Sequence, residues 1–287
     1  MRTLVVAHVY YPQLWPELAE CIRSIDGTRD LIVTYVDGTS VAEARRDFSE
    51  ARFLKCENCG FDIWPFICAL RSVDLGTYDA VVKLHTKRDI VKDHDWYFNN
   101  CRFNGAAWRN HLLSFCRTRE AWARTVRRLS ELGVGMVADR HVVVRRRDFP
   151  WKAVRECFDA AVAEVRAIGG CAPFDERSAQ YVSGTMFAAR PEPLAFFLRH
   201  GFDVGMFEAS GHAAGTEPVL YAHRVENLLG LSVSAVGWRI VAWNGSLRWR
   251  RFYAPILRAA VRVKETRNRR MLKVFGIPVL WRTKNLI

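Results

Sequence analysis

The residues with the clearest chemistry follow a short apolar run at 80–82. Lys83 and Leu84 lead from this run into His85-Thr86-Lys87-Arg88-Asp89, a mainly cationic sequence with one carboxylate. Arg and Lys bind phosphate groups, and open α/β sheets bind ligands outside the carboxyl ends of their strands. If residues 79–84 form such a strand, His85, Thr86 and Lys87 are candidates to bind a nucleotide diphosphate. A strand followed by a solvated turn would give the same pattern.

Two other segments carry side chains suited to a nucleotide. His8 and Tyr10 follow the first apolar run, and Asp37 follows the second. Aromatic rings can stack on a base, and a carboxylate can accept hydrogen bonds from a ribose. Asn58 and Asp62 lie in a glycine-containing segment, where Asp62 could cap the next helix or contact a ligand hydroxyl. Ordinary strand-end and capping residues remain the alternative for both segments.

A third group lies near the middle of the second half. Gly184 interrupts a predicted strand, which often marks close approach of a ligand, and Thr185 adds a hydroxyl. Glu217 is placed at a predicted helix start, where its carboxylate would be ionised and suited to a general base. His223 and Glu226, on the body of that helix, are further catalytic candidates. Favourable pairing with the helix dipole alone would also account for Glu217.

Alternating strands and helices must position these residues. The apolar patterns predict strands over 4–9, 30–36, 51–56, 79–84, 135–138, 180–188 and 232–236. They predict helices over 14–25, 41–49, 63–75, 107–132, 151–168, 192–200 and 217–229. This alternation is typical of an α/β fold with a mainly parallel sheet flanked by helices.

Composition narrows the class of protein. Half of the 287 residues are apolar, so a large core can form, yet no apolar run is long enough to cross a membrane. The N-terminal residues resemble a first strand rather than a signal peptide. The eight cysteines are scattered in apolar contexts, as in a reducing compartment. We therefore expect a cytoplasmic protein. Cys56 and Cys59 have the spacing of half a metal site, but no second pair matches it.

The net charge of +13 is concentrated at the C-terminal end. Residues 245–287 contain twelve Lys or Arg and one acid, Glu265, which leaves about +2 for residues 1–244. We expect a domain at 1–244 and a basic tail at 245–287, with a basic amphipathic helix over 254–271. Such a helix favours an anionic membrane surface. Nucleic-acid binding, which we do not favour, and packing on the main domain are the alternatives.

Taken in order, these motifs resemble the rhamnan synthesis protein F family over residues 4–237. The segments that carry the resemblance are 8–18, 58–66, 83–87, 108–113, 183–187 and 223–230. The resemblance implies a GT-A-like glycosyltransferase that builds bacterial surface polysaccharide or lipopolysaccharide. It implies a nucleotide-sugar donor such as dTDP-rhamnose and a lipid-linked or polysaccharide acceptor. With the basic tail, we expect a peripheral protein on the inner face of the bacterial plasma membrane. A non-catalytic protein that tethers membranes or RNA through its tail is the alternative.

The chain departs from the family at two motifs. Phe61 stands where the family usually has arginine, and Glu226-Asn227 replaces a Glu-Arg pair. Many GT-A enzymes hold Mg²⁺ or Mn²⁺ with an Asp-x-Asp motif after the central strand. Here Asp89 is the candidate ligand, beside His85, which suits a hard cation poorly. We therefore favour direct stabilisation of the diphosphate by Lys87 and Arg88 over a metal.

Overall fold

The computed structural model describes residues 1–89, 96–98, 101–103, 106–146, 152–207, 221–245, 261–266, 269–274 and 277–283. The chain divides into two compact units, Met1–Asn244 and Gly245–Ile287. Among the described residues, no helix is both long enough and apolar enough to cross a membrane.

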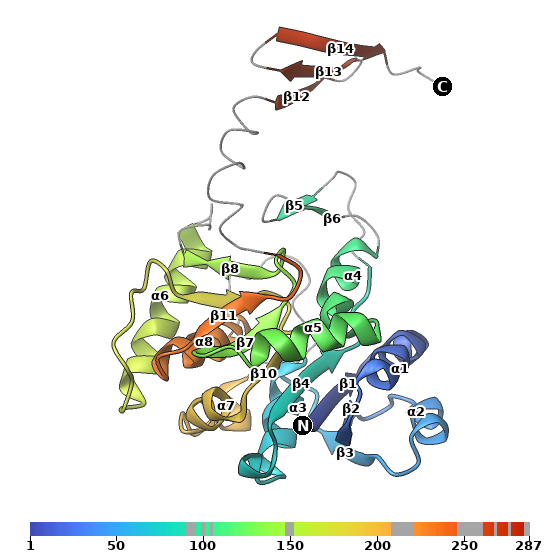
Figure 1. The fold of residues 1–287 in the computed structure, drawn as a ribbon, viewed down its shortest axis with the longest axis vertical. Helices are drawn as coiled ribbons and strands as arrows, with labels where there is room; N and C mark the ends of the chain where they lie inside the picture. Colours follow the sequence, from blue (N-terminus) through green and yellow to red (C-terminus); the bar gives the residue numbers. More distant parts are fainter. Residues whose placement is uncertain are drawn as a thin grey trace. The chain divides into compact units, whose positions relative to one another are not determined.

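A seven-stranded sheet forms the centre of the first unit, in the order β11-β7-β10-β4-β1-β2-β3 (Figure 1). Its strands are β1 (Arg2–Val9), β2 (Thr28–Val36), β3 (Arg52–Cys56), β4 (Ala80–His85), β7 (Val134–Ala138), β10 (Phe187–Ala189) and β11 (Arg239–Ala242). All neighbouring strands pair in parallel except β10, which runs antiparallel to β4 and β7. The predicted α/β fold with a mainly parallel sheet is therefore confirmed.

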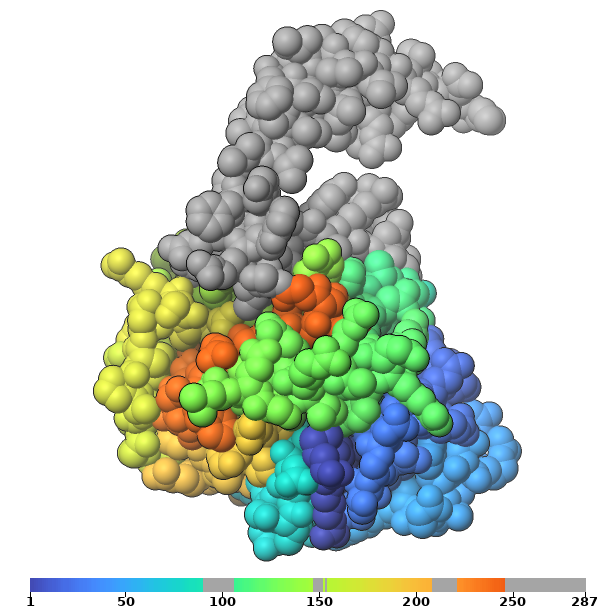
Figure 2. Space-filling view, in the orientation of Figure 1, coloured from blue at the N-terminus to red at the C-terminus, as the bar shows by residue number. Residues whose placement is uncertain are grey.

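Helices flank this sheet. They are α1 (Trp15–Ser24), α2 (Ala42–Asp47), α3 (Ile63–Arg71), α4 (Ala107–Leu113), α5 (Arg119–Leu129), α6 (Lys152–Ala167), α7 (Pro191–Leu198) and α8 (Tyr221–Ala235). Every residue of β4 and all but the first residue of β1 are buried, as expected for central strands covered on both faces. Helix α5 lies across one side of the unit in Figure 1, and its side chains cover that face in Figure 2.

Short strands complete the described backbone of the first unit. β5 (Trp96–Phe98) pairs with β6 (Cys101–Phe103), and β8 (Val143–Arg145) pairs with β9 (Gln180–Val182). The single strand predicted over 180–188 is wrong, because β9 and β10 are separated by a turn in which Gly184 has φ +78°. The strand predicted over 232–236 is also wrong. Helix α8 continues to Ala235, a turn follows in which Gly237 has φ +76°, and the strand comes only at β11.

The second unit contains an antiparallel sheet of β12 (Val261–Thr266), β13 (Arg269–Val274) and β14 (Ile277–Thr283). The helix predicted over 254–271 is therefore wrong at 261–266 and 269–271, while residues 254–260 lie outside the described residues. Val261 and Val263 alternate with Arg262 and Lys264, and this period of two is that of a strand. The helical spacing depended on the apolar residues before position 261.

Candidate functional site

A pocket of about 520 Å³ lies at the carboxyl ends of β1 and β4. Its lining combines the strand ends, the turn before α3, the turn before β10 and the first turns of α8. Eleven candidates from the sequence line it: His8, Tyr10, Asp62, His85, Thr86, Lys87, Asp89, Gly184, Thr185, His223 and Glu226. The remaining lining residues are Tyr11, Phe61, Ile63, Arg88 and Ala222.

Three residues predicted from the sequence are not among the residues that line this pocket. Asp37 is exposed and forms an ion pair with Lys55 on the neighbouring strand, at 2.7 Å. Asn58 is exposed and does not line the pocket. Glu217 lies outside the described residues. Among the predicted carboxylates, Asp62, Asp89 and Glu226 are the ones that face the pocket.

A buried network fixes Asp62 at the base of the pocket. The ammonium group of Lys83, on β4, donates hydrogen bonds to Asp62 and, at 2.8 Å, to the Thr185 hydroxyl. The Thr185 hydroxyl donates to the same Asp62 oxygen at 2.5 Å. Burial would raise the pKa of Asp62, but the Lys83 ammonium group and these hydrogen bonds hold that pKa well below its usual range. Asp62 is therefore an ionised carboxylate with a fixed orientation.

Two buried histidines stand side by side on β1 and β4. His8 and His85 are register partners, and Nδ1 of His8 lies 3.0 Å from the Thr34 hydroxyl. Burial lowers the pKa of His8 to about 4 and lowers that of His85 well below its usual value. Both rings are therefore neutral near pH 7. Neither ring nitrogen of His85 has a hydrogen-bond partner among the described residues, although Nδ1 lies 3.5 Å from Oδ2 of Asp62.

Glu226 reaches the pocket from α8. Its Oε1 accepts a hydrogen bond of 2.5 Å from the Gly184 backbone N–H. Burial raises the pKa of Glu226 to about 7, although the Gly184 hydrogen bond acts in the opposite direction. A carboxylate with this pKa can accept a proton at neutral pH and release it again, which is the requirement for a general base.

Strained backbone borders the pocket on two sides. Phe61 (φ +53°) and Thr185 (φ +49°) are the residues other than glycine that have positive φ in the described chain, and each follows a glycine with positive φ. A β-branched residue such as Thr185 rarely adopts this conformation, at a cost of roughly 1–3 kcal/mol. The strained turn places the Thr185 hydroxyl on Asp62 and the Gly184 N–H on Glu226.

Contacts with α4 hold the segment after β4, residues 87–89, in position. Arg109, on α4, donates to the Lys87 carbonyl at 3.1 Å, pairs with Asp89, and donates to both carboxylate oxygens of Glu17 on α1. The Thr86 hydroxyl accepts hydrogen bonds of 2.9 Å from two backbone N–H groups at the end of β1. Thr86 therefore shapes the pocket wall, and Asp89 is already engaged by a guanidinium.

Sequence reasoning left Lys83 and Arg109 out of the candidate list. Lys83 lies within the strand predicted over 79–84, and a lysine in a buried strand is itself the signal, because such a group requires a charged partner. Arg109 carried no local signal beyond its place in a motif.

The chain matches the model of the rhamnan synthesis protein F family over residues 1–233. It is 28% identical over 249 residues to the uncharacterized protein WxcX of Xanthomonas campestris pv. campestris strain B100, a match that covers 85% of this chain. The WxcX protein of strain ATCC 33913 is 27% identical over a similar length. The match covers 33% of each WxcX protein, so the chain spans about a third of the curated relatives it matches.

Similar solved structures include glucosyl-3-phosphoglycerate synthase from Mycobacterium tuberculosis in complex with Mn²⁺, UDP and glucosyl-3-phosphoglycerate. It is 15% identical, with a TM-score of 0.35, over 98% of this chain and 90% of that one. A 4-diphosphocytidyl-2C-methyl-D-erythritol synthase is 12% identical, with a TM-score of 0.39, over 90% of this chain and 98% of that one. These scores are too low to support an argument about the ligands of this chain.

Proposed function

The chain belongs to the rhamnan synthesis protein F family, and we propose that it is a glycosyltransferase acting on a nucleotide-sugar donor. The transferred sugar would be rhamnose or another deoxyhexose, with dTDP-rhamnose as the first donor to test. The acceptor would be a lipid-linked or polysaccharide chain of a surface polysaccharide or lipopolysaccharide. Because the match covers 33% of the curated relatives, the proposal concerns the activity of this chain alone.

One observation carries the proposal: cationic residues and a carboxylate of raised pKa line the same pocket. Lys87 and Arg88 line it after β4, and Glu226 lines it from α8. Glycosyl transfer breaks the bond between the anomeric carbon and a diphosphate oxygen, and an acceptor hydroxyl oxygen forms the new bond to that carbon. Lys87 and Arg88 would stabilise the charge on the departing diphosphate, while Glu226 would take the proton of the hydroxyl.

Asp62 and His85 would orient the donor. Asp62 keeps a fixed, ionised carboxylate beside the pocket, which can accept a hydrogen bond from a sugar or ribose hydroxyl. The ring of His85, which also lines the pocket and has Nδ1 3.5 Å from Oδ2 of Asp62, would take part in a second such bond. Lys83 and Thr185 would act through Asp62 as positioning residues.

The residues of the pocket fit Mg²⁺ or Mn²⁺ poorly. Asp89, the candidate ligand, pairs with Arg109, and its neighbours Lys87 and Arg88 are cations. Hard divalent ions prefer several oxygen ligands, and such a set is not assembled around Asp89 by the described residues. We therefore propose that side-chain cations, rather than a metal, stabilise the leaving group.

A donor screen would test this proposal. Release of nucleoside diphosphate would be measured for a panel of nucleotide sugars, each with Mn²⁺ and with a chelator. We expect release from one deoxyhexose donor, with little change on chelation and a loss of activity in Lys87→Ala. Absence of release from every donor, together with no thermal stabilisation by nucleoside diphosphates, would refute the assignment.

We also propose that residues 245–287 bind the anionic inner face of the plasma membrane. The support is their charge of about +11, which attracts acidic lipids. Vesicles with and without acidic lipid would be sedimented with the full chain and with a variant in which Arg248, Arg250 and Arg251 are changed to Gln. Binding that is equal for the two vesicle types would contradict the proposal, and selective binding to RNA would favour the tethering alternative.

A further inference from the structure

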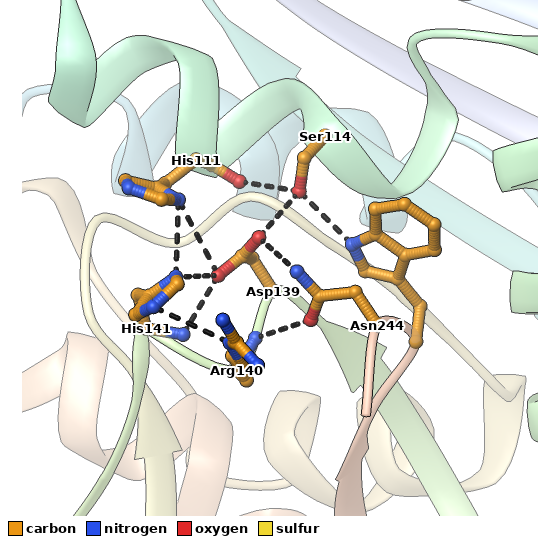
Figure 3. Close-up of polar contacts among 7 residues, drawn as sticks. His111, Ser114, Asp139, Arg140, His141 and Asn244 are labelled. Atoms are coloured by element: carbon orange, nitrogen blue, oxygen red, sulfur yellow. Dashed lines mark hydrogen bonds and ion pairs between the residues drawn. The ribbon is translucent and has the colours of Figure 1, made fainter. Parts of the chain in front are cut away.

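A second cluster of polar side chains lies away from the pocket, at the carboxyl end of β7. His111 comes from the last turn of α4, Asp139 directly follows β7, and His141 lies two residues further on. Figure 3 shows the two imidazole rings and the Asp139 carboxylate directed toward one another. None of the three lines the pocket described above. We propose that His111, Asp139 and His141 bind one zinc ion.

The distances between the three facing atoms match those of a zinc site. Nδ1 of His111 lies 3.2 Å from Nδ1 of His141 and 3.6 Å from Oδ1 of Asp139, and the third side of the triangle is 2.9 Å. Ligands about 2.0–2.1 Å from a tetrahedral zinc ion are separated from one another by ~3.3 Å. Zinc could therefore be accommodated with shifts of a few tenths of an ångström.

The ligand types favour zinc over the harder cations. Two imidazole nitrogens and one carboxylate oxygen are a common set for zinc and other transition ions, whereas Mg²⁺ and Ca²⁺ select oxygen. Both histidines keep part of their side chains exposed, 25% for His111 and 17% for His141. A fourth position on the solvent side is thus open to water or to a substrate group.

The Asp139 carboxylate is held in place as metal ligands usually are. Its side chain is 1% exposed, and its Oδ2 lies 2.8 Å from the Ser114 hydroxyl and accepts a hydrogen bond of 2.7 Å from the Asn244 amide. Trp243 donates in turn to the Ser114 hydroxyl at 2.9 Å. Such outer contacts leave Oδ1 directed at the two histidines and fix its orientation.

Hydrogen bonds hold the three facing atoms together without a metal. Oδ1 of Asp139 accepts the His141 backbone N–H at 2.7 Å. The Nδ1–H of His141 can be shared between Oδ1 of Asp139 at 2.9 Å and Nδ1 of His111 at 3.2 Å. Zinc would displace this one proton, after which Oδ1 and both Nδ1 atoms can act as ligands.

Zinc would change one contact of the cluster. Arg140 Nε lies 3.3 Å from Nε2 of His141, as drawn in Figure 3. A metal on Nδ1 leaves the imidazole proton on Nε2, so the exposed Arg140 side chain would have to turn into solvent. Removing this side chain should therefore leave zinc affinity unchanged or increase it.

The zinc site and the pocket would both depend on helix α4. Arg109, which braces Lys87 and Asp89 at the pocket, and His111 both belong to α4. A zinc ion on His111 would attach the C-terminal turn of α4 to the end of β7. The binding proposal itself does not depend on the transfer reaction.

Zinc binding can be measured directly on the full chain. After dialysis against a chelator, the protein would be titrated with Zn²⁺ by calorimetry and with Co²⁺ by visible absorption. We expect one equivalent to bind, with the spectrum of a nitrogen- and oxygen-ligated Co²⁺ ion and without the intense absorption of thiolate ligands. His111→Gln and His141→Gln should each weaken binding by at least the ~10–100-fold typical of a lost outer contact.

Ser114→Ala is a further test, and Arg140→Ala is the matched control. Ser114→Ala removes an outer contact and should weaken zinc binding by ~10–100-fold, whereas Arg140→Ala should not weaken it. Circular dichroism and thermal unfolding in chelator would show that each variant is folded. The proposal is wrong if the wild-type chain takes up no zinc, if both glutamine variants bind it as tightly, or if Co²⁺ reports thiolate ligands.

Discussion

Glu226→Gln should make the protein less active and, at high pH, more stable. Burial raises the pKa of Glu226 from 4.5 to about 7. Ionising this carboxyl at neutral pH therefore destabilises the folded state relative to the unfolded state. A rise of this size corresponds to at most about 3 kcal/mol. Glutamine keeps an oxygen to accept the Gly184 N–H but never ionises, so the variant avoids the cost.

The pH dependence of this effect is specific. Below about pH 4.5 the carboxyl is protonated in both states, and the free energies of unfolding of wild type and variant should agree. The difference should grow as pH rises from 4.5 to about 7 and remain constant above that value. Urea unfolding at pH 4.5, 6 and 8 measures it. Glu20→Gln, at an exposed position of α1, is the control and should show no such trend.

Activity should change in the opposite direction. If Glu226 is the base, Glu226→Gln should lower kcat by roughly 10²–10⁴. The wild-type rate of nucleoside diphosphate release should rise through about pH 7, and this rise should be absent from the variant. A variant that is no more stable than Glu20→Gln at pH 8 would refute the reasoning about burial. A variant that keeps its activity would refute the role as base.

Three further changes test the site and its support. Lys83→Met should lower the free energy of unfolding by about 3–5 kcal/mol in urea, because it leaves the buried Asp62 carboxylate without its cation. Lys87→Ala should raise the KM for the donor and lower kcat, with a combined loss of ~10–100-fold in kcat/KM measured by diphosphate release. Gly230→Ala should destabilise the fold by about 2–4 kcal/mol in thermal unfolding, because the new Cβ would lie 2.3 Å from the Tyr181 Cα.

Each of these three substitutions has a second variant with which its effect is compared. Lys83→Met combined with Asp62→Asn should recover part of the lost stability, and a double variant as unstable as the single one would argue against the ion pair. Lys55→Ala removes a lysine whose ion pair with Asp37 is exposed, and it should leave kcat/KM unchanged. Gly230 lies inside α8 without a positive φ, so its loss of stability should come from steric overlap, whereas Gly38→Ala, at φ +76° with no atom within 4 Å, measures backbone strain alone.

The sequence predicts the pocket well where the sheet itself determines it. His8 and His85 end adjacent parallel strands, and apolar periodicity is enough to place both at one edge. Asp37 illustrates the limit of this reasoning. It also follows a parallel strand, but Lys55 on the next strand binds its carboxylate, and only the pairing of β2 with β3 reveals that neighbour.

Contacts between distant segments could not be predicted. Lys83 lies 21 residues from Asp62 and 102 residues from Thr185, and nothing in the local pattern joins them. His111 lies 30 residues before His141, outside any familiar ligand spacing. At Gly184, glycine was recognised as unusual, but a strand interior was inferred where the chain makes a turn with positive φ. A glycine within an apolar run indicates an unusual backbone conformation, but it does not show whether that conformation is a strand irregularity or a turn.

The antiparallel strand β10 has a consequence for how the chain is made. Strands β3, β2, β1 and β4 are complete once residue 85 has been synthesised, but the free edge of β4 pairs only with Phe187–Ala189, about 100 residues later. β7 pairs with two of these residues, Ala188 and Ala189. Two apolar strand edges are therefore open on the growing chain until β10 is inserted between them, and pairing over such separations is slow. Chains that end before residue 187 should aggregate through these edges rather than fold.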